Sequence, residues 1–214
     1  MKRREFSTAL ACSTAMASFA QQSLYLKGRD FSELGKRAAV EAPGNKIEVA
    51  DFFWYGCTHC NAFEPLLEAW IAKLPADVQI RRVPVHFRDD FEPQQRLYFT
   101  LEAMGKVAEL HGKVFDEIHQ RRSTLTTNSQ ILAWVETRRE INSEQFKLLF
   151  NSFSVVAKAK KAKITQDEYA LGGVPALGVA GKYYTDSTLA QNMPRALQIV
   201  DMLIQSERAI KARS

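Results

Sequence analysis

Apolar residues follow two different periods in the first half of the chain. Residues 47–53 form a short, continuous run of β-branched and aromatic residues, which predicts a buried β-strand and not an amphipathic helix. In residues 58–74 the apolar positions recur every three or four residues, the period of a helix with one buried face. Pro65 lies inside this helix and predicts a kink. Alternation returns in residues 78–87 and predicts a second strand, with Pro84 at a sheet edge or an irregular end. Strand, helix and strand with a short return predict a right-handed parallel βαβ unit.

Residues 94–167 contain helical periodicity and no strand pattern. The helical runs break at Gly105, at residues 123–128, and at Asn142 and Ser143, which are both good N-cap residues. The pattern therefore predicts a helical insertion of four or five helices.

Strand patterns resume after this insertion. Residues 176–180 predict a strand, Gly181 and Lys182 a tight turn, and residues 183–184 an antiparallel return strand. Asn192 and Pro194 mark the start of a last helix over residues 193–205. Ahead of the first strand, residues 24–45 are largely polar and predict a lead-in with a short edge strand at residues 24–26.

The first residues have the pattern of a cleavable export signal. Lys2, Arg3 and Arg4 precede an uncharged stretch over residues 6–19, and small residues follow, which places cleavage after Ala20. The stretch is too short and too rich in Ser and Thr to span a bilayer. Arg3 and Arg4 also resemble a twin-arginine signal, and either export route ends outside the cytoplasm. The chain thus divides into a signal peptide (residues 1–20), an α/β domain in two halves (residues 21–93 and 168–214) and the helical insertion (residues 94–167).

Composition supports a globular protein and argues against a nucleic-acid partner. Hydrophobic residues make up 46% of the 214 residues, enough for a packed core. The net charge of +5 is modest, and part of it lies in the signal. The densest basic segments, residues 121–122, 138–139 and 158–163, lack the interleaved aromatic residues that stack on bases. They are interpreted as solvated helix faces.

The cysteines carry the strongest chemical signal. Of the three in the sequence, Cys12 lies in the signal, which leaves Cys57 and Cys60. These two cysteines are separated by two residues, and they lie directly after Gly56 at the start of the predicted helix. Unpaired amides and the aligned peptide dipoles of a helix N-terminus stabilise a thiolate there. The dipole contributes about 0.3 to 2 kcal/mol, or about one pKa unit. Amide hydrogen bonds and the imidazole of His59 are the candidates for the rest.

Cys57 is therefore the predicted nucleophile, and the more buried Cys60 the resolving thiol. A purely structural disulfide is disfavoured, because closing so small a loop removes little chain entropy. The other histidines, His86, His111 and His119, have neither the cysteine partners nor the helical spacing of a zinc site, so no metal is expected.

The segment from Phe52 to Cys60, Phe-Phe-Trp-Tyr-Gly-Cys-Thr-His-Cys, together with Gly-Gly-Val-Pro at residues 172–175, resembles the DsbA family of bacterial periplasmic thiol:disulfide oxidoreductases. The similarity covers about residues 24–204. The resemblance implies a thioredoxin-like α/β domain (β-α-β, then β-β-α) split by an all-helical insertion. Thr58 departs from the family, which most often has proline at this position, and this residue bears on the redox poise.

The resemblance also assigns residues outside the dithiol. It implies that Pro175 follows a cis peptide bond and lies against the cysteines, with the backbone of Val174 pairing to an extended substrate peptide. Asp51 matches a family acid beneath the dithiol and would accept the proton of Cys60, or else form an ion pair with Arg82, where the family has lysine. Glu64 matches another family acid or is a solvated helix residue.

The sequence thus predicts a dithiol oxidase whose Cys57–Cys60 disulfide passes to reduced, unfolded exported proteins, with no cofactor beyond that disulfide. The resemblance implies reoxidation by a DsbB-like membrane quinone reductase. A monomer is expected, because the lead-in is too short to form a dimerisation domain. Two alternatives stay open: a periplasmic reductase or isomerase kept reduced, and a redox-inert peptide-binding chaperone.

Overall fold

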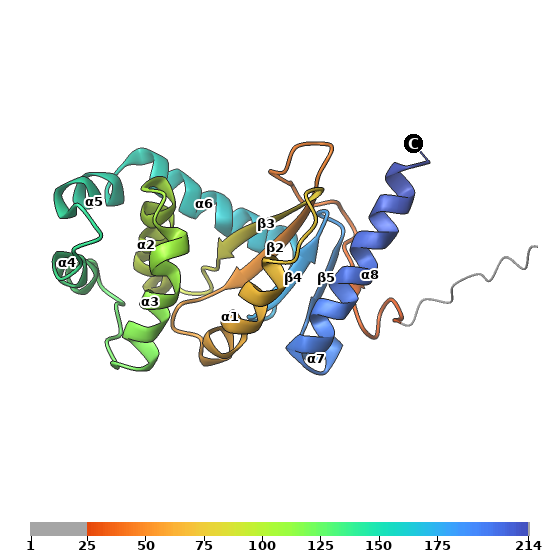
Figure 1. The fold of residues 1–214 in the computed structure, drawn as a ribbon, viewed down its shortest axis with the longest axis horizontal. Helices are drawn as coiled ribbons and strands as arrows, with labels where there is room; N and C mark the ends of the chain where they lie inside the picture. Colours follow the sequence, from red (N-terminus) through yellow and green to blue (C-terminus); the bar gives the residue numbers. More distant parts are fainter. Residues whose placement is uncertain (1–24, 214) are drawn as a thin grey trace, which may run out of the picture.

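A five-stranded sheet forms the centre of the structure, a computed structural model that describes residues 25–213 (Figure 1). The strands lie in the order β1-β5-β4-β2-β3. Strands β2 (Ile47–Phe53) and β3 (Val78–Pro84) are parallel and joined through helix α1 (Thr58–Ile71), which confirms the predicted βαβ unit. Strands β4 (Ala176–Val179) and β5 (Tyr183–Asp186) form the predicted hairpin, and β4 runs antiparallel to β2.

Five helices lie between β3 and β4 in the sequence. They are α2 (Glu92–Ala103), α3 (Val107–His119), α4 (Asn128–Glu136), α5 (Ser143–Phe150) and α6 (Phe153–Glu168), preceded by a short 3-10 turn at Asp89–Phe91. Gly105 takes a positive φ at the first break, and Asn142 caps α5 as its sequence predicts. Helices α2 to α5 gather at one end of the molecule (Figure 1), while α6 runs back along the sheet.

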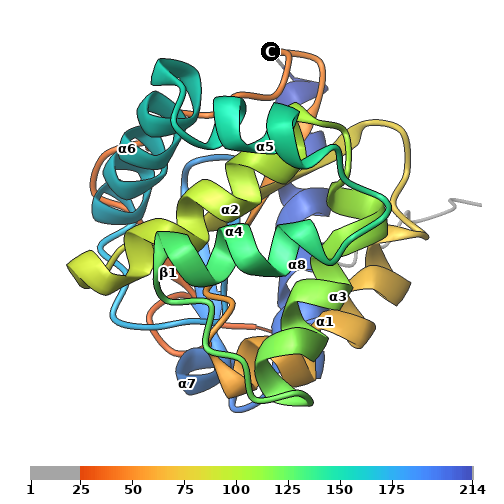
Figure 2. The ribbon, with the colours of Figure 1, turned by 90° about the vertical axis from the view of Figure 1, so that its left-hand side faces the viewer.

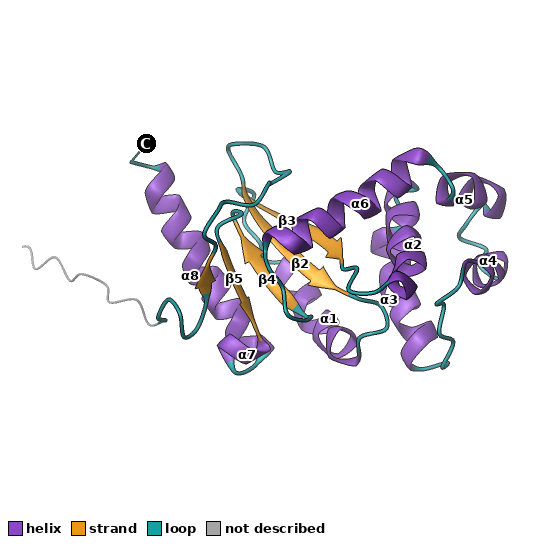
Figure 3. Ribbon diagram, turned by 180° about the vertical axis from the view of Figure 1, so that it is seen from behind, coloured by secondary structure: helices purple, strands orange, loops and turns teal. Residues whose placement is uncertain are grey.

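The sheet is covered on both faces, and β2 is buried along its whole length. Helix α1 and the last helix, α8 (Met193–Lys211), cover one face together with Ile47 and Val49 of β2. Helix α6 covers the opposite face, which Figure 3 shows in front, and packs with Ala50 and Phe52. Because alternate side chains of a strand point to opposite faces, β2 contributes to both cores.

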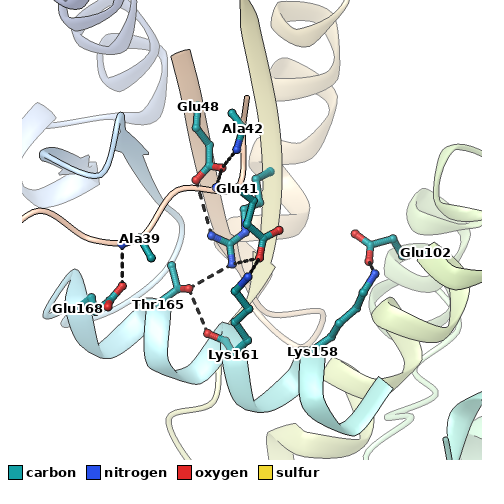
Figure 4. A network of polar contacts seen from close by, with 10 residues as sticks. Ala39, Glu41, Ala42, Glu48, Glu102, Lys158, Lys161, Thr165 and Glu168 are labelled. Atoms are coloured by element: carbon teal, nitrogen blue, oxygen red, sulfur yellow. Dashed lines mark hydrogen bonds and ion pairs between the residues drawn. The ribbon is translucent and has the colours of Figure 1, made fainter. Parts of the chain in front are cut away.

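The segment that leads into β2 is held against α6 by polar contacts (Figure 4). The amide of Ala39 donates to Glu168 at 3.0 Å, and Lys161 lies 2.8 Å from the carboxylate of Glu41. Arg81 of β3 completes the network, 3.0 Å from Glu41 and 3.2 Å from the hydroxyl of Thr165.

The edge strand expected at residues 24–26 is wrong. Leu24 lies outside the described residues, and Tyr25 and Leu26 are not in a strand. The edge strand β1 is Ser32–Glu33, paired antiparallel with β5. The carboxylate of Asp30 accepts a hydrogen bond from the amide of Leu26 at 2.8 Å, and Gly28 takes a positive φ. This hydrogen bond and the backbone conformation of Gly28 fold the segment ahead of β1 into a turn.

Several expected ends and one short helix also differ. Strand β4 ends at Val179, one residue before its expected end, and β5 continues to Asp186, two residues past its expected end. The second strand ends at Pro84, because His86 turns away to bond Gln166 of α6 at 2.6 Å. Helix α1 ends at Ile71, a few residues before Pro75, which disfavours helix in the residue before it. Helix α8 continues past residue 205 to Lys211, held by ion pairs such as Arg208 to Asp77 at 2.6 Å. The one-turn helix α7 (Ser187–Ala190), capped by Asp186, was not expected.

Candidate active site

A tight turn delivers the two cysteines to the start of α1. The amide of Cys57 donates to the carbonyl of Trp54 at 3.0 Å, so Tyr55 and Gly56 are the central residues of the turn. A Cβ atom at position 56 would lie 2.3 Å from the Trp54 ring, so only glycine fits there. Cys57 is the N-cap of α1, and its sulfur accepts a hydrogen bond from the amide of Cys60 at 3.2 Å. The predicted placement of Cys57 at a helix N-terminus is confirmed.

The two thiols are pushed to opposite pKa values. The pKa of Cys57 is lowered to about 6, chiefly by a hydrogen bond with the Cys60 thiol, which outweighs the partial burial of the sulfur. The amides of Cys60 and His59 and the charge of His59 act in the same direction. Burial raises the pKa of Cys60, and the neighbouring sulfur and Asp51 raise it further. Near neutral pH the pair therefore holds one thiolate and one buried thiol.

The loop before β4 lies against Cys57. The peptide bond between Val174 and Pro175 is cis, as the family resemblance implies. The carbonyl oxygen of Val174 lies 3.5 Å from the sulfur of Cys57. The structure thus brings together the dithiol and a loop that is more than a hundred residues away in the sequence.

A largely apolar groove of about 390 Å³ runs beside the dithiol. It is lined mainly by Phe63 and Leu66 of α1 and by Met193 and Pro194 at the start of α8, with His59 and Pro175 on the side of the cysteines. A second hollow, of about 470 Å³, also borders Pro175 and has a mixed lining that includes Val174, Asp186 and Thr188. Both hollows therefore border Pro175, the residue whose loop lies against the sulfur of Cys57.

Asp51, Glu64 and Arg82 form a buried charged cluster, and Asp51 and Arg82 are register partners on β2 and β3. The guanidinium of Arg82 donates to Asp51 at 3.0 Å and to Glu64 at 2.7 Å, and it also pairs with Glu68. The ion pair between Asp51 and Arg82, one of the two alternatives for Asp51, is present. Glu64 is only 9% exposed, so the alternative of a solvated residue is wrong.

Burial and the neighbouring charges affect the two acids of the cluster differently. It raises the pKa of Asp51 to about 7, although the charge of Arg82 opposes the shift. Burial also acts to raise the pKa of Glu64, but contacts with His111 and Arg82 hold it below its ordinary value. Asp51 is therefore the group in the cluster whose charge changes near neutral pH.

Sequence reasoning missed two histidines of α3 that contact the active-site turn. Nδ1 of His111 lies 2.8 Å from the hydroxyl of Tyr55, and its Nε2 lies 2.9 Å from Nη1 of Arg82. His119 lies 2.8 Å from the carbonyl of Tyr55. A signal existed for His111: it falls on the apolar stripe of its helix, three and four residues before Val114 and Phe115.

The remaining candidates lie at the surface. Thr58 and His59, between the cysteines, are exposed at the start of α1.

Within residues 25–213 no group of three or more histidine, cysteine or acidic side chains is placed to hold a metal ion. The site thus combines a half-buried thiolate at Cys57, a buried thiol at Cys60, a backbone carbonyl and an apolar groove. Such a site can exchange disulfides with an extended peptide.

Known proteins resemble this chain over most of its length. It is 35% identical to the thiol:disulfide interchange protein DsbA of Burkholderia cepacia over 199 residues, which cover 93% of this chain and 92% of that protein. It is 40% identical to the DsbA of Azotobacter vinelandii over 182 residues, 85% of this chain and 84% of that protein. No family model matches the chain.

A solved structure gives the same picture. The crystal structure of Pseudomonas aeruginosa DsbA superposes with a TM-score of 0.83 at 36% identity, and the match covers 88% of this chain and 97% of that one. The predicted α/β fold, a thioredoxin-like domain with a helical insertion, is thereby confirmed.

Proposed function

Because this chain belongs to the DsbA family of thiol:disulfide interchange proteins, it is a protein disulfide oxidoreductase, and we propose that Cys57 is the sulfur through which it exchanges disulfides. The observation that supports this role most strongly is the position of Cys57 as the N-cap of α1, where its pKa falls to about 6. The substrates of the family are proteins that acquire disulfides.

The reaction proceeds in two exchanges. A substrate thiolate attacks the sulfur of Cys57 in the oxidised protein, the Cys57–Cys60 bond breaks, and the sulfur of Cys60 leaves and takes up a proton. A second substrate thiolate then attacks the substrate sulfur of the mixed disulfide, and Cys57 leaves as a thiolate. The substrate loses two electrons and two protons, and the Cys57–Cys60 disulfide gains the electrons. One proton resides on Cys60, and the other goes to solvent because Cys57 stays ionised near neutral pH.

Stabilising the Cys57 thiolate makes this direction favourable. A leaving thiol with a low pKa departs more readily, and the reduced protein is stabilised relative to the oxidised one. About 30 mV of reduction potential corresponds to about 1.4 kcal/mol for this two-electron couple. A low pKa at Cys57 therefore favours an oxidase over a reductase or isomerase kept reduced.

Asp51 is the proposed proton carrier for Cys60. Its charge raises the pKa of Cys60, and burial brings its own pKa to about 7. A carboxyl group that is partly protonated near neutral pH can supply a proton to the departing Cys60 sulfur and accept it back on reoxidation. The ion pair with Arg82 holds Asp51 in place, so the two roles considered for Asp51 are compatible.

Substrate is held by the Val174 loop and the apolar groove. An extended peptide that pairs with the backbone of Val174 would bring its cysteine to the sulfur of Cys57, because the Val174 carbonyl lies 3.5 Å from that sulfur. The groove beside His59 accepts apolar side chains without demanding one sequence, which suits a protein that acts on many unfolded chains.

The reduced dithiol must be reoxidised, and we propose a DsbB-like membrane quinone reductase as the electron acceptor. A partner loop that carries a disulfide would use the same groove as the substrate. We also propose that the protein acts as a monomer in the periplasm, where protein disulfides persist. The signal that supports export lies outside the described residues. Among residues 25–213 there is no helix with the length and apolar character needed to span a bilayer.

The test is oxidation of a reduced, unfolded protein by the purified oxidised chain. One substrate disulfide should form for each protein molecule, and Cys57→Ser should abolish the reaction. Cys60→Ser, in which the free Cys57 thiolate can attack a substrate that already carries a disulfide, should instead accumulate a mixed disulfide with that substrate at Cys57. Undiminished oxidation by the Cys57→Ser variant would refute the assignment. A reduction potential close to that of a cytosolic thioredoxin would favour the reductase, and full peptide-binding activity without either cysteine would favour the chaperone.

A further inference from the structure

Helix α3 contacts both ends of Tyr55, the residue two positions before the nucleophile. His111 lies 2.8 Å from the Tyr55 hydroxyl, and His119 lies 2.8 Å from the Tyr55 carbonyl oxygen. The two histidines are eight residues apart, about 12 Å along a helix axis, and lie on the same side of α3. Figure 2 shows α3 beside α1, the helix that begins with the cysteines. The insertion therefore contacts the turn at Tyr55.

The partner of His119 fixes its tautomer. A carbonyl oxygen only accepts hydrogen bonds, so Nε2 of His119 carries a hydrogen and donates a hydrogen bond to the Tyr55 carbonyl. Nε2 of His111 faces two groups with opposite roles: the guanidinium of Arg82, which donates, at 2.9 Å, and the carboxylate of Glu64, which accepts, at 3.4 Å. Burial lowers the pKa of His111.

The peptide between Tyr55 and Gly56 is the part of the turn that needs holding. The φ of Gly56 is not in the positive, left-handed range. A flip of the Tyr55–Gly56 peptide would convert the turn to type II, in which the third residue, here Gly56, has a positive φ. A residue with a Cβ would resist that flip, whereas glycine adopts either conformation. The Trp54 ring requires glycine at position 56 and so leaves the turn free to flip. The hydrogen bond from His119 fixes the carbonyl that would have to rotate.

We propose that His119 is a positioning residue for Cys57: its hydrogen bond to the Tyr55 carbonyl holds the Tyr55–Gly56 peptide in one orientation and thereby fixes the N-cap placement of the sulfur. His111 anchors the Tyr55 ring to the buried cluster at the other end of the residue. A peptide dipole of about 3.5 D is reversed when the peptide flips, so the flip also changes the field at the sulfur. The helical insertion thus helps to set the redox poise of the dithiol, in addition to covering the sheet.

Two variants of one residue test this proposal, with the full chain titrated and equilibrated with glutathione. His119→Leu removes the donor, whereas the side-chain amide nitrogen of His119→Gln can take the place of Nε2. We expect His119→Leu to raise the pKa of Cys57 and to shift the equilibrium constant with glutathione about tenfold toward the oxidised protein, equivalent to about 30 mV. His119→Gln should restore both quantities to within about twofold of the original chain.

A control separates positioning from loss of stability. Val114→Ala removes buried side-chain volume from α3 and keeps His119, so it should lower the free energy of unfolding without moving the titration of Cys57. The proposal is overturned if the pKa of Cys57 in His119→Leu equals that in the original chain. It is also overturned if His119→Gln shifts this pKa as much as His119→Leu does, or if Val114→Ala shifts it equally. The inference rests on the proposed role of Cys57 as the nucleophile, and that role is tested separately. His119→Leu should still oxidise substrate. Failure of the proposed function would instead show as a lack of oxidation by the original chain.

Discussion

At the scale of single residues, the site depends on how two neighbouring sulfurs share one environment. Burial alone would raise the pKa of both cysteines. The helix dipole can offset only about one pKa unit. The lowering of the Cys57 pKa to about 6 therefore needs the hydrogen bonds from Cys60 and His59. Burial raises the pKa of Cys60, and the hydrogen bond to the neighbouring sulfur raises it further.

The titration of Cys57 gives the first prediction. In the reduced protein the ultraviolet absorbance of the thiolate should rise with a midpoint near pH 6, and Cys57→Ser should lack the transition. The folded-state pKa is depressed, so the thiolate contributes stability above the unfolded thiol pKa of about 8.5, and this contribution is lost as the pH falls through about 6. Urea unfolding of the reduced chain and of reduced Cys57→Ser should therefore diverge as the pH rises. A midpoint near that of a free thiol would contradict the assignment.

Asp51 gives a prediction of the opposite sign. Its folded-state pKa of about 7 is raised, so its contribution to stability is present below the unfolded pKa of about 4 and is lost as the pH rises through about 7. As the pH rises through about 7, Asp51→Asn should therefore become more stable relative to the original chain. The gain in the free energy of unfolding should be about 1.4 kcal/mol for each unit by which the pKa of Asp51 is raised on folding. Urea unfolding from about pH 5 to about pH 8 measures the difference, with the surface variant Glu136→Gln as control. A difference that stays constant with pH would show that Asp51 does not titrate in this range.

The sequence reveals the parts of the site whose chemistry is local. Cys57, Cys60 and His59 lie together in the chain, and the strand and helix around them could be recognised from their periods. The pair of Asp51 and Arg82 needed only the register of two neighbouring strands. His119 could not be found in this way, because its partner is a backbone carbonyl 64 residues away that any residue type would present.

At the scale of elements, the interiors of helices and strands followed their periods, but tertiary contacts decided where they end. Strand β3 ends near the point where the amide of His86 donates a hydrogen bond to the side chain of Gln166. Helix α8 is longer than expected because Arg208 forms an ion pair with Asp77. The end of α6 meets the sheet equally closely, since a Cβ at Gly178 of β4 would lie 2.4 Å from the ring of Tyr169. Local sequence does not record such partners, which explains why these ends were misplaced.

The groove between α1 and α8 gives a prediction at this scale. Leu66 lies on the exposed side of α1 with 39% of its surface accessible, and it lines the groove. Leu66→Glu would place a charge where an apolar partner residue packs, so KM for an unfolded protein substrate should rise about tenfold. The rate with glutathione, which is too small to fill the groove, should change by less than about twofold. Leu148→Glu, on the exposed side of α5, is the control, and an equal effect of both variants would exclude a role for the groove.

At the scale of the whole molecule, the helical insertion and the sheet share one core. A single cluster of buried side chains includes Phe146 and Phe150 of α5, Phe52 and Phe53 of β2, and Cys60 of α1. The insertion is thus not a separately packed lid, although its helices are consecutive in the sequence. A continuous core of this kind couples the unfolding of its parts.

Cooperative unfolding is the last prediction, and Cys60 reports it because it is only 2% exposed. In the Cys57→Ser background, Phe146→Ala should destabilise the chain by about 3 to 5 kcal/mol. The loss should be the same when unfolding in urea is followed by helical circular dichroism and by alkylation of Cys60. The matched control on the same helix is Leu148→Ala, whose side chain is 77% exposed and should cost less than about 0.5 kcal/mol. If Phe146→Ala lowers the helical signal while Cys60 stays protected, the insertion unfolds alone and the shared core does not couple it to the dithiol.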